Sequence, residues 1–228
     1  MTARPYVVLS CAMSIDGYID DTTPERLLLS NAKDFDRVDE VRASSDAIMI
    51  GATTLRKDNP RLLVNSADRR AERETQGLPA YPVKVTITAT GNLDPDLKFW
   101  HYGGLKLVYC PDPVAADLKD RLRDLAEIIS LGPNVDLTAM LNDLGGRGVR
   151  SLMVEGGGEI HTQFLTQDLA DEINLAIAPF FVGDSGAPRF VNPGIFPNGP
   201  DKRMELAEVR SIGDIAFLRY QVRPRTFR

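Results

Sequence analysis

The sequence predicts an α/β fold: a central, mostly parallel sheet flanked by helices, with an antiparallel hairpin at the C-terminus. Short apolar runs alternate with helix-type patterns through most of the 228 residues, which is typical of parallel sheets. Residues 204–223 read instead as two strands joined at Ile212-Gly213-Asp214, a pattern typical of a hairpin. No internal repeat or domain boundary is visible, so we expect one domain over residues 1–228.

The expected strands are short apolar runs bounded by turn residues. "YVVLSCAM" and "DAIMIG" are continuous apolar runs, and "VKVTIT" alternates between apolar and polar residues. The expected strands before the hairpin are residues 6–13, 46–51, 83–88, 105–110, 151–155 and 172–183, with a short one at 127–130.

The expected helices follow from apolar residues at helical spacing. In residues 30–45 these are Phe35, Val38 and Val41, with Ser30 or Asn31 as the N-cap. Further helices are expected over residues 114–126 and 136–148 and directly after residue 158. Residues 65–80 are polar and are expected to form an exposed, partly helical excursion, and residues 186–201 a loop.

Composition excludes several classes of function. The formal net charge is −5, which gives no general affinity for nucleic acid or an anionic membrane. Cys11 and Cys110 lie in apolar runs and are expected to be buried thiols. His101 and His161 are far apart and away from any cysteine cluster, so no metal site is expected. The first apolar run is too short for a signal peptide, and a cytoplasmic protein is expected.

The glycine run 156–158 is the first candidate site. It lies between an expected strand and an expected helix, in "SLMVEGGGEIHTQFL". Amides at a helix start point outward and favour anions, and glycine lets a diphosphate approach the backbone. A tight turn that binds no ligand is an equally good interpretation of the run alone.

Two polar residues flank this run. Glu155 ends the strand and could accept hydrogen bonds from the amino group of a heterocycle, or could bond neighbouring amides instead. His161 lies one turn into the helix and is interpreted as a solvated or packed histidine.

The stretch "IGATTLRKDNPRLLV", residues 50–64, is the second candidate site. The hydroxyls of Thr53 and Thr54 follow the strand end at Gly51, where they could bind a phosphate or a ribose. Asp58 precedes Asn59-Pro60 and could reach a ligand or simply cap the turn.

Taken together and in order, these motifs resemble the reductase domain of bacterial riboflavin-biosynthesis deaminase/reductases, a family with the dihydrofolate reductase fold. The matching stretches are "MSIDGYI", "VRASSDAIMIGATTLRKDNPRLLV", "SLMVEGGGEI" and "ADEINLAIAPFFVG". The resemblance covers nearly the whole chain. It implies an NADPH-dependent reduction of a ribosylaminopyrimidine 5′-phosphate by a homodimer.

The resemblance also implies roles for individual residues. Cofactor contacts are expected at Met13, Thr54, Asp58 and the segment from Gly157 to Gln163, which includes Gly158, Glu159 and Ile160, with Thr53 and Gly156 beside them. Thr88 and Thr90 are placed where the adenosine 2′-phosphate would lie. Arg42, Leu62 and Glu155 are expected to contact the substrate, and Asp58 and Glu155 are the candidate catalytic carboxylates.

Two departures from the family pattern keep alternatives open. Ser10 and Asn65 stand where the family often has a lysine and an arginine. Other basic residues could compensate: Arg26, Arg56, Lys57 and Arg61. A pteridine such as dihydrofolate therefore stays an alternative substrate, and a nucleotide-binding regulatory module without catalysis is a third hypothesis.

Overall fold

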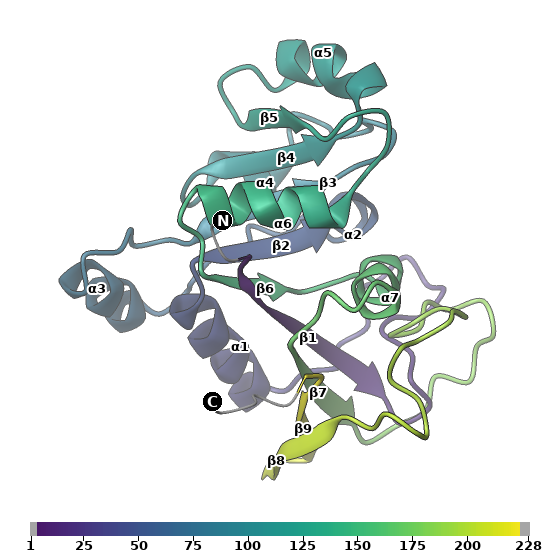
Figure 1. Ribbon diagram of the computed structural model, residues 1–228. Helices are drawn as coiled ribbons and strands as arrows, with labels where there is room; N and C mark the ends of the chain where they lie inside the picture. The colour runs from purple at the N-terminus through teal and green to yellow at the C-terminus, as the bar shows by residue number, and fades with distance from the viewer. Residues whose placement is uncertain (1–3, 224–228) are drawn as a thin grey trace. The chain divides into compact units, whose positions relative to one another are not determined.

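The computed structural model describes residues 4–223, which contain nine strands and seven helices. The strands form a mixed sheet that is mostly parallel and ends in an antiparallel hairpin, so the predicted fold class is confirmed (Figure 1). Contacts divide the chain into two compact units, which are described separately below. The first unit comprises residues 4–5 and 39–153, and the second comprises residues 6–38 and 154–223. A single reductase domain over residues 1–228 stays a prediction.

Every segment that the sequence predicted to be a strand contains a strand. The strands are β1 (Tyr6–Ser14), β2 (Ala47–Gly51), β3 (Val83–Ile87), β4 (Lys106–Cys110), β5 (Glu127–Ser130), β6 (Ser151–Val154), β7 (Glu172–Ala178), β8 (Glu205–Ile212) and β9 (Ile215–Gln221). The helices are α1 (Ala32–Ser44), α2 (Ala52–Asp58), α3 (Ala67–Thr75), α4 (Lys98–His101), α5 (Asp112–Arg121), α6 (Leu137–Gly146) and α7 (Gly158–Thr166).

In the first unit, four parallel strands lie in the order β5-β4-β3-β2. Their carboxyl ends therefore meet at one edge, where Gly51 pairs with Ile87. Figure 1 shows α6 lying across these strands. Loops at the carboxyl ends of parallel strands are the usual place for ligands, and Thr53, Thr54 and Thr90 follow the strands at this edge.

Apolar side chains of these strands pack against the helices that follow them. One buried cluster joins β2 and β4 to α2 and α5 through residues that include Ile50, Leu55, Val108 and Leu118. Each such buried side chain stabilises the fold by about 1.5–3 kcal/mol. The cluster thus fixes where α2, which carries Thr53 and Thr54, leaves the sheet.

In the second unit, β1 pairs in parallel with β7, and β9 pairs antiparallel with both β7 and β8. Gly213, with φ of 66°, makes the predicted hairpin turn. Asn31 also holds this turn, because its amide nitrogen donates to the carbonyl of Ile212 at 2.7 Å. The Asn31 side-chain oxygen accepts the amide of Asp34 at 3.0 Å, as one of the two proposed N-caps of α1 would.

The buried face of α1 differs from the apolar stripe that the sequence suggested. Phe35 is 42% exposed, whereas Asp34 and Arg37 are buried and form an ion pair of 2.7 Å. The Arg37 guanidinium also lies 4.6 Å from the ring centroid of Phe217. The ion pair allows both charged side chains to be buried. The inward face of α1 therefore carries charged residues, which the spacing of apolar residues did not predict.

Several element boundaries also differ from the predictions. Helix α5 begins at Asp112 because Pro113 is tolerated in a first helical turn, and it ends at Arg121 rather than at 126. Strand β7 ends at Ala178, directly before Pro179, which has no amide to donate to a ladder. The excursion at 65–80 contains α3, capped by the Ser66 hydroxyl, and the short helix α4 was not predicted.

Both cysteines, Cys11 and Cys110, are buried free thiols, as expected. Burial raises the pKa of the Cys11 thiol to about 12. Within residues 4–223 no helix is both long and apolar enough to cross a membrane.

Candidate functional site

The glycine bend, defined as residues 156–158, joins β6 to α7 in the second unit. Gly156 has φ of 129°, a conformation that side chains other than hydrogen rarely allow. Gly157 is the N-cap of α7 and supplies no side-chain hydrogen bond to the first helical turn. Its φ of −90° is open to any residue. The φ of Gly157 therefore does not itself require glycine.

Gly158 is explained by packing within the protein. A Cβ atom built at this position would overlap the carbonyl oxygen of Arg189. The same loop continues along α7, where the amide of Asn192 donates to the Thr162 hydroxyl at 2.8 Å. A Cβ on Gly194 would lie 2.9 Å from a methyl carbon of Thr166. The loop 186–194 thus fixes the start of α7 by direct backbone contact.

The turn after β1 is tied to the same loop. The amide of Phe190 donates to the carbonyl of Gly17 at 3.0 Å, and the Arg189 guanidinium donates to the Tyr18 hydroxyl at 2.7 Å. Asp16 accepts the amides of Val182 and Gly183. The motif "MSIDGYI", which follows the proposed cofactor contact Met13, is therefore linked through loop 186–194 to the glycine bend.

His161 is fully buried in α7, which confirms the interpretation as a packed histidine. Its ring lies 5.1 Å from the ring of Phe190 and would be 3.7 Å from a Cβ at Gly156. Neither ring nitrogen has a hydrogen-bond partner of good geometry within residues 4–223. Burial lowers the pKa of His161 to about 4, so the ring is neutral at pH 7.

The remaining predicted residues of the glycine bend differ in what they can offer a ligand. Glu155 is half-buried and follows the last residue of β6. The Glu159 side chain is exposed, whereas Ile160 is 9% exposed. Ile160 can therefore contribute its backbone amide more readily than its side chain.

In the first unit, α2 presents Thr53 and Thr54 at the carboxyl end of β2. The exposed Thr53 hydroxyl accepts a hydrogen bond from Arg56 at 3.1 Å, and Arg56 also donates to the carbonyl of Asn92 at 3.0 Å. Thr54 is half-buried. Arg56 thus joins the start of α2 to the loop after β3.

That loop contains the two threonines proposed for the adenosine 2′-phosphate. Thr88 is 3% exposed and its hydroxyl accepts the amide of Gly91 at 3.0 Å, so it has a structural role. Thr90 is exposed. Of the two, Thr90 is therefore the better placed to meet a ligand.

The segment after α2 brings together two of the proposed substrate contacts. Leu62 is 4% exposed and has φ of 51°, and Asn59 has φ of 42°. The guanidinium of Arg42 donates to the carbonyl of Leu63 at 2.9 Å. Asp58 is half-buried at the last position of α2.

Lys84 holds this segment from β3. Its ammonium donates to the carbonyls of Arg61 at 2.8 Å and Tyr102 at 2.9 Å, and also to that of Phe99. Burial, followed by the charge of Lys106, lowers the pKa of Lys84 to about 7. Three carbonyl acceptors match the three N–H groups of the charged form and oppose that shift.

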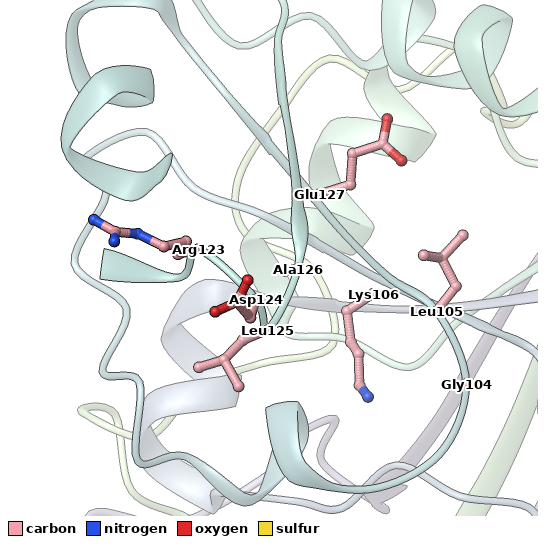
Figure 2. Close-up of a pocket in the computed structure, with 8 residues that line it drawn as sticks. All are labelled: Gly104, Leu105, Lys106, Arg123, Asp124, Leu125, Ala126 and Glu127. Carbon is pink, nitrogen blue, oxygen red and sulfur yellow. The ribbon is translucent and has the colours of Figure 1, made fainter. Parts of the chain in front are cut away.

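A pocket of about 440 Å³ in the first unit lies away from these residues (Figure 2). It is lined by residues 104–106 and 123–127, at the amino ends of β4 and β5. Figure 2 shows that Lys106, Arg123, Asp124 and Glu127 line it. Since Thr53, Thr54 and Thr90 follow the carboxyl ends of β2 and β3, this pocket is separate from them.

The structure thus brings the predicted residues together in two sets, one in each unit. Residues 4–223 contain no group of three or more His, Cys, Asp or Glu side chains that could hold a metal ion. Sequence reasoning missed Arg189, whose carbonyl explains Gly158. No local pattern signals such a contact, because it joins residues far apart in the chain.

Residues 5–217 match the model of the RibD C-terminal domain family. The chain belongs to this family. It is 32% identical over 212 residues to the 2,5-diamino-6-ribosylamino-4(3H)-pyrimidinone 5′-phosphate reductase of Archaeoglobus fulgidus, covering 92% of this chain and 95% of the relative. It is also 32% identical to the protein of that name from Methanothermobacter thermautotrophicus, covering 96% and 99%.

Solved structures of the RibD family share the fold. The Acinetobacter baumannii RibD structure has a TM-score of 0.78 at 22% identity, and the match covers 96% of this chain and 58% of that chain. A pyrimidine reductase-like protein from Corynebacterium diphtheriae has a TM-score of 0.73 at 22% identity, covering 95% of this chain and 91% of that chain.

The buried, neutral His161 leads to a prediction about stability and pH. An unfolded histidine titrates near pH 6.5, so between about pH 6.5 and 4 the unfolded state binds more protons than the folded state. The contribution of His161 to the free energy of unfolding is therefore complete above pH 6.5, and it falls by about 3 kcal/mol when the pH is lowered to 4.

The measurement is the free energy of unfolding by urea at several pH values. His161→Leu, which introduces no unpartnered polar group, is expected to show a flatter fall than the wild type in this range. His101→Leu is the matched control, because His101 is exposed. Equal slopes for the wild type and His161→Leu would contradict the neutral, buried state of His161.

Proposed function

We propose that this protein is an NADPH-dependent reductase of a ribosylaminopyrimidine 5′-phosphate in riboflavin biosynthesis. Membership of the RibD C-terminal domain family over residues 5–217 is the observation that carries the proposal. Relatives at 32% identity, matched over 95% and 99% of their length, are named as reductases of the 2,5-diamino pyrimidinone. We therefore favour the diamino compound over 5-amino-6-(5-phosphoribosylamino)uracil as the substrate.

The glycine bend fits the diphosphate of such a coenzyme. Gly156 and Gly157 carry no side chain, and the N-cap of α7 leaves the first-turn amides without a side-chain partner of its own. Amides at a helix start carry partial positive charge and bind phosphate oxygens. In this proposal Gly156, Gly157, Gly158, Glu159 and Ile160 hold the diphosphate through their backbone.

The other proposed cofactor contacts come from three places. They are Met13 at the end of β1, Thr53, Thr54 and Asp58 on α2, and Thr88 and Thr90 after β3. The hydroxyl of Thr90 and the nearby Arg56 are suited to a 2′-phosphate, which distinguishes NADPH from NADH. Bound NADPH would supply a hydride.

The substrate contacts are proposed to be Arg42, Leu62 and Glu155. Reduction of the ring-opened imine adds a hydride to the sugar C1 and a proton to the imine nitrogen, so one carbon–hydrogen and one nitrogen–hydrogen bond form. Asp58 and Glu155 are the proposed carboxylates for delivering that proton, either directly or through water. The other chemical requirement is to orient the imine, because hydride transfer depends mainly on positioning.

Two further parts of the proposal concern assembly and location. We propose that the protein is a homodimer, as the family resemblance implies, and that it acts in the cytoplasm.

The experiment is a panel of substrates offered with NADPH and with NADH, followed by oxidation of the coenzyme. We expect turnover with NADPH and a ribosylaminopyrimidine 5′-phosphate, and none with dihydrofolate. Turnover of dihydrofolate alone would favour the pteridine reductase alternative. No turnover of any member, with the coenzyme bound, would favour a regulatory module.

Gly157 provides the mutational test of the cofactor site. The φ of Gly157 lies in the extended region that any residue adopts, so Gly157→Val introduces no positive-φ strain, and its branched side chain is expected to obstruct the first-turn amides. We expect the Kd for NADPH, measured by calorimetry, to rise at least about tenfold, the loss of one charge-assisted contact.

Gly157→Ala is the matched variant and should have a smaller effect, since its methyl group is shorter. Gly158→Ala is unsuitable here because it would clash with the Arg189 carbonyl and disturb folding. Wild-type affinity in a folded Gly157→Val protein would show that the diphosphate binds elsewhere.

A further inference from the structure

Helix α3 carries three arginines, and two of them serve the fold. Arg73 is 4% exposed and donates to the carbonyls of Ala43, Ser45 and Pro79 at 2.6–2.9 Å. Arg69 forms an ion pair of 3.0 Å with Asp39. Both charges therefore have a structural explanation within the first unit.

Arg70 is held differently. Its Nη1 atom donates to the carbonyls of Val64 at 2.9 Å and Asn65 at 2.7 Å. Its guanidinium carbon lies 5.5 Å from the ring centroid of Tyr81. Within residues 4–223 no carboxylate pairs with Arg70, and its Nε and Nη2 donors have no protein acceptor. The side chain is thus oriented at one nitrogen while its charge is not neutralised.

The carbonyls that hold Arg70 belong to the segment of the proposed substrate site. Leu62 begins this segment in a left-handed conformation, and the guanidinium of Arg42 bonds the next carbonyl, that of Leu63. Arg42 and Arg70 therefore bind three consecutive carbonyls, at residues 63, 64 and 65. Two cations converge on one short stretch of backbone.

A protein of net charge −5 needs local cations to bind a phosphorylated substrate. The relatives at 32% identity are named for a substrate with a 5′-phosphate. Asn65 contributes no charge, but its carbonyl orients the guanidinium of Arg70. A guanidinium fixed at one nitrogen can offer its remaining N–H groups to two phosphate oxygens at once.

We propose that Arg70 binds the 5′-phosphate of the substrate and so determines specificity for the phosphorylated compound. This inference rests on the proposed function. It assigns the phosphate contact to α3, outside the motif stretches that carry the family resemblance.

The test compares each phosphorylated substrate with its dephosphorylated counterpart. For Arg70→Gln we expect kcat/KM for the phosphorylated compound to fall about 10- to 100-fold, as expected for loss of hydrogen bonds to a charged group. The value for the dephosphorylated compound should stay unchanged, so the ratio between the two collapses. Arg70→Lys keeps the positive charge but lacks the paired N–H donors of the guanidinium, so it should retain part of the preference for the phosphorylated compound.

Arg123→Gln is the matched control, since Arg123 is an exposed arginine that lines the pocket at the amino ends of β4 and β5. It should leave both values as in the wild type. If Arg70→Gln lowers both substrates equally, or neither, Arg70 does not read the phosphate and the inference is overturned.

A binding measurement separates this inference from the proposed function. Ribose 5-phosphate and ribose are titrated into the wild type and Arg70→Gln, with no reaction required. Weaker binding of ribose 5-phosphate to Arg70→Gln, with ribose unaffected, supports the inference. Equal binding to both proteins overturns it. If the wild-type protein reduces neither the phosphorylated nor the dephosphorylated substrate, the proposed function is contradicted, whereas the binding result still decides this inference.

Discussion

The contact between the carbonyl of Arg189 and the bare α-carbon of Gly158 is the constraint on which the second unit depends. It leaves no room for a side chain at the start of α7 and brings loop 186–194 against that helix. The same loop binds the turn after β1 through Tyr18 and Gly17. One close backbone approach therefore positions three segments that are far apart in sequence.

This contact also divides the roles of the three glycines. Gly156 is needed for its φ of 129° and Gly158 for packing, whereas the φ of Gly157 lies in the extended region. A glycine run at a helix start can thus be required by the fold at two positions and remain available for a ligand at the third. The two interpretations of the run are compatible, because they apply to different residues.

The sequence predicted the strands well, because each is a short apolar run bounded by turn residues, and the hairpin at Gly213 followed from turn chemistry. It predicted helix faces less well. Asp34 and Arg37 are buried because they form an ion pair with each other and because Arg37 packs on Phe217, and neither contact is visible in the sequence. The glycine run, Glu155, Thr53, Thr54 and Asp58 were found as local motifs, whereas the family resemblance supplied Met13, Arg42, Leu62, Thr88 and Thr90. Arg70 and Arg189 came from neither source, because their roles depend on backbone carbonyls that only the folded chain brings near.

A few placed donors are enough for an acidic protein to hold two anionic ligands. Backbone amides at the glycine bend supply partial positive charge without adding any net charge. Arg56 and Arg70 are each held by backbone carbonyls, which orient a guanidinium without supplying a negative charge. Placement of a few donors, and not overall charge, is then what selects the ligands.

The most direct test of the central claim is hydrogen exchange of the backbone amides at residues 157–160, with and without NADPH. If these amides bind the diphosphate, the coenzyme should slow their exchange, while the amides of α6 exchange as before. Unchanged exchange at residues 157–160, at NADPH concentrations that saturate the protein, would contradict the assignment of the glycine bend to the coenzyme.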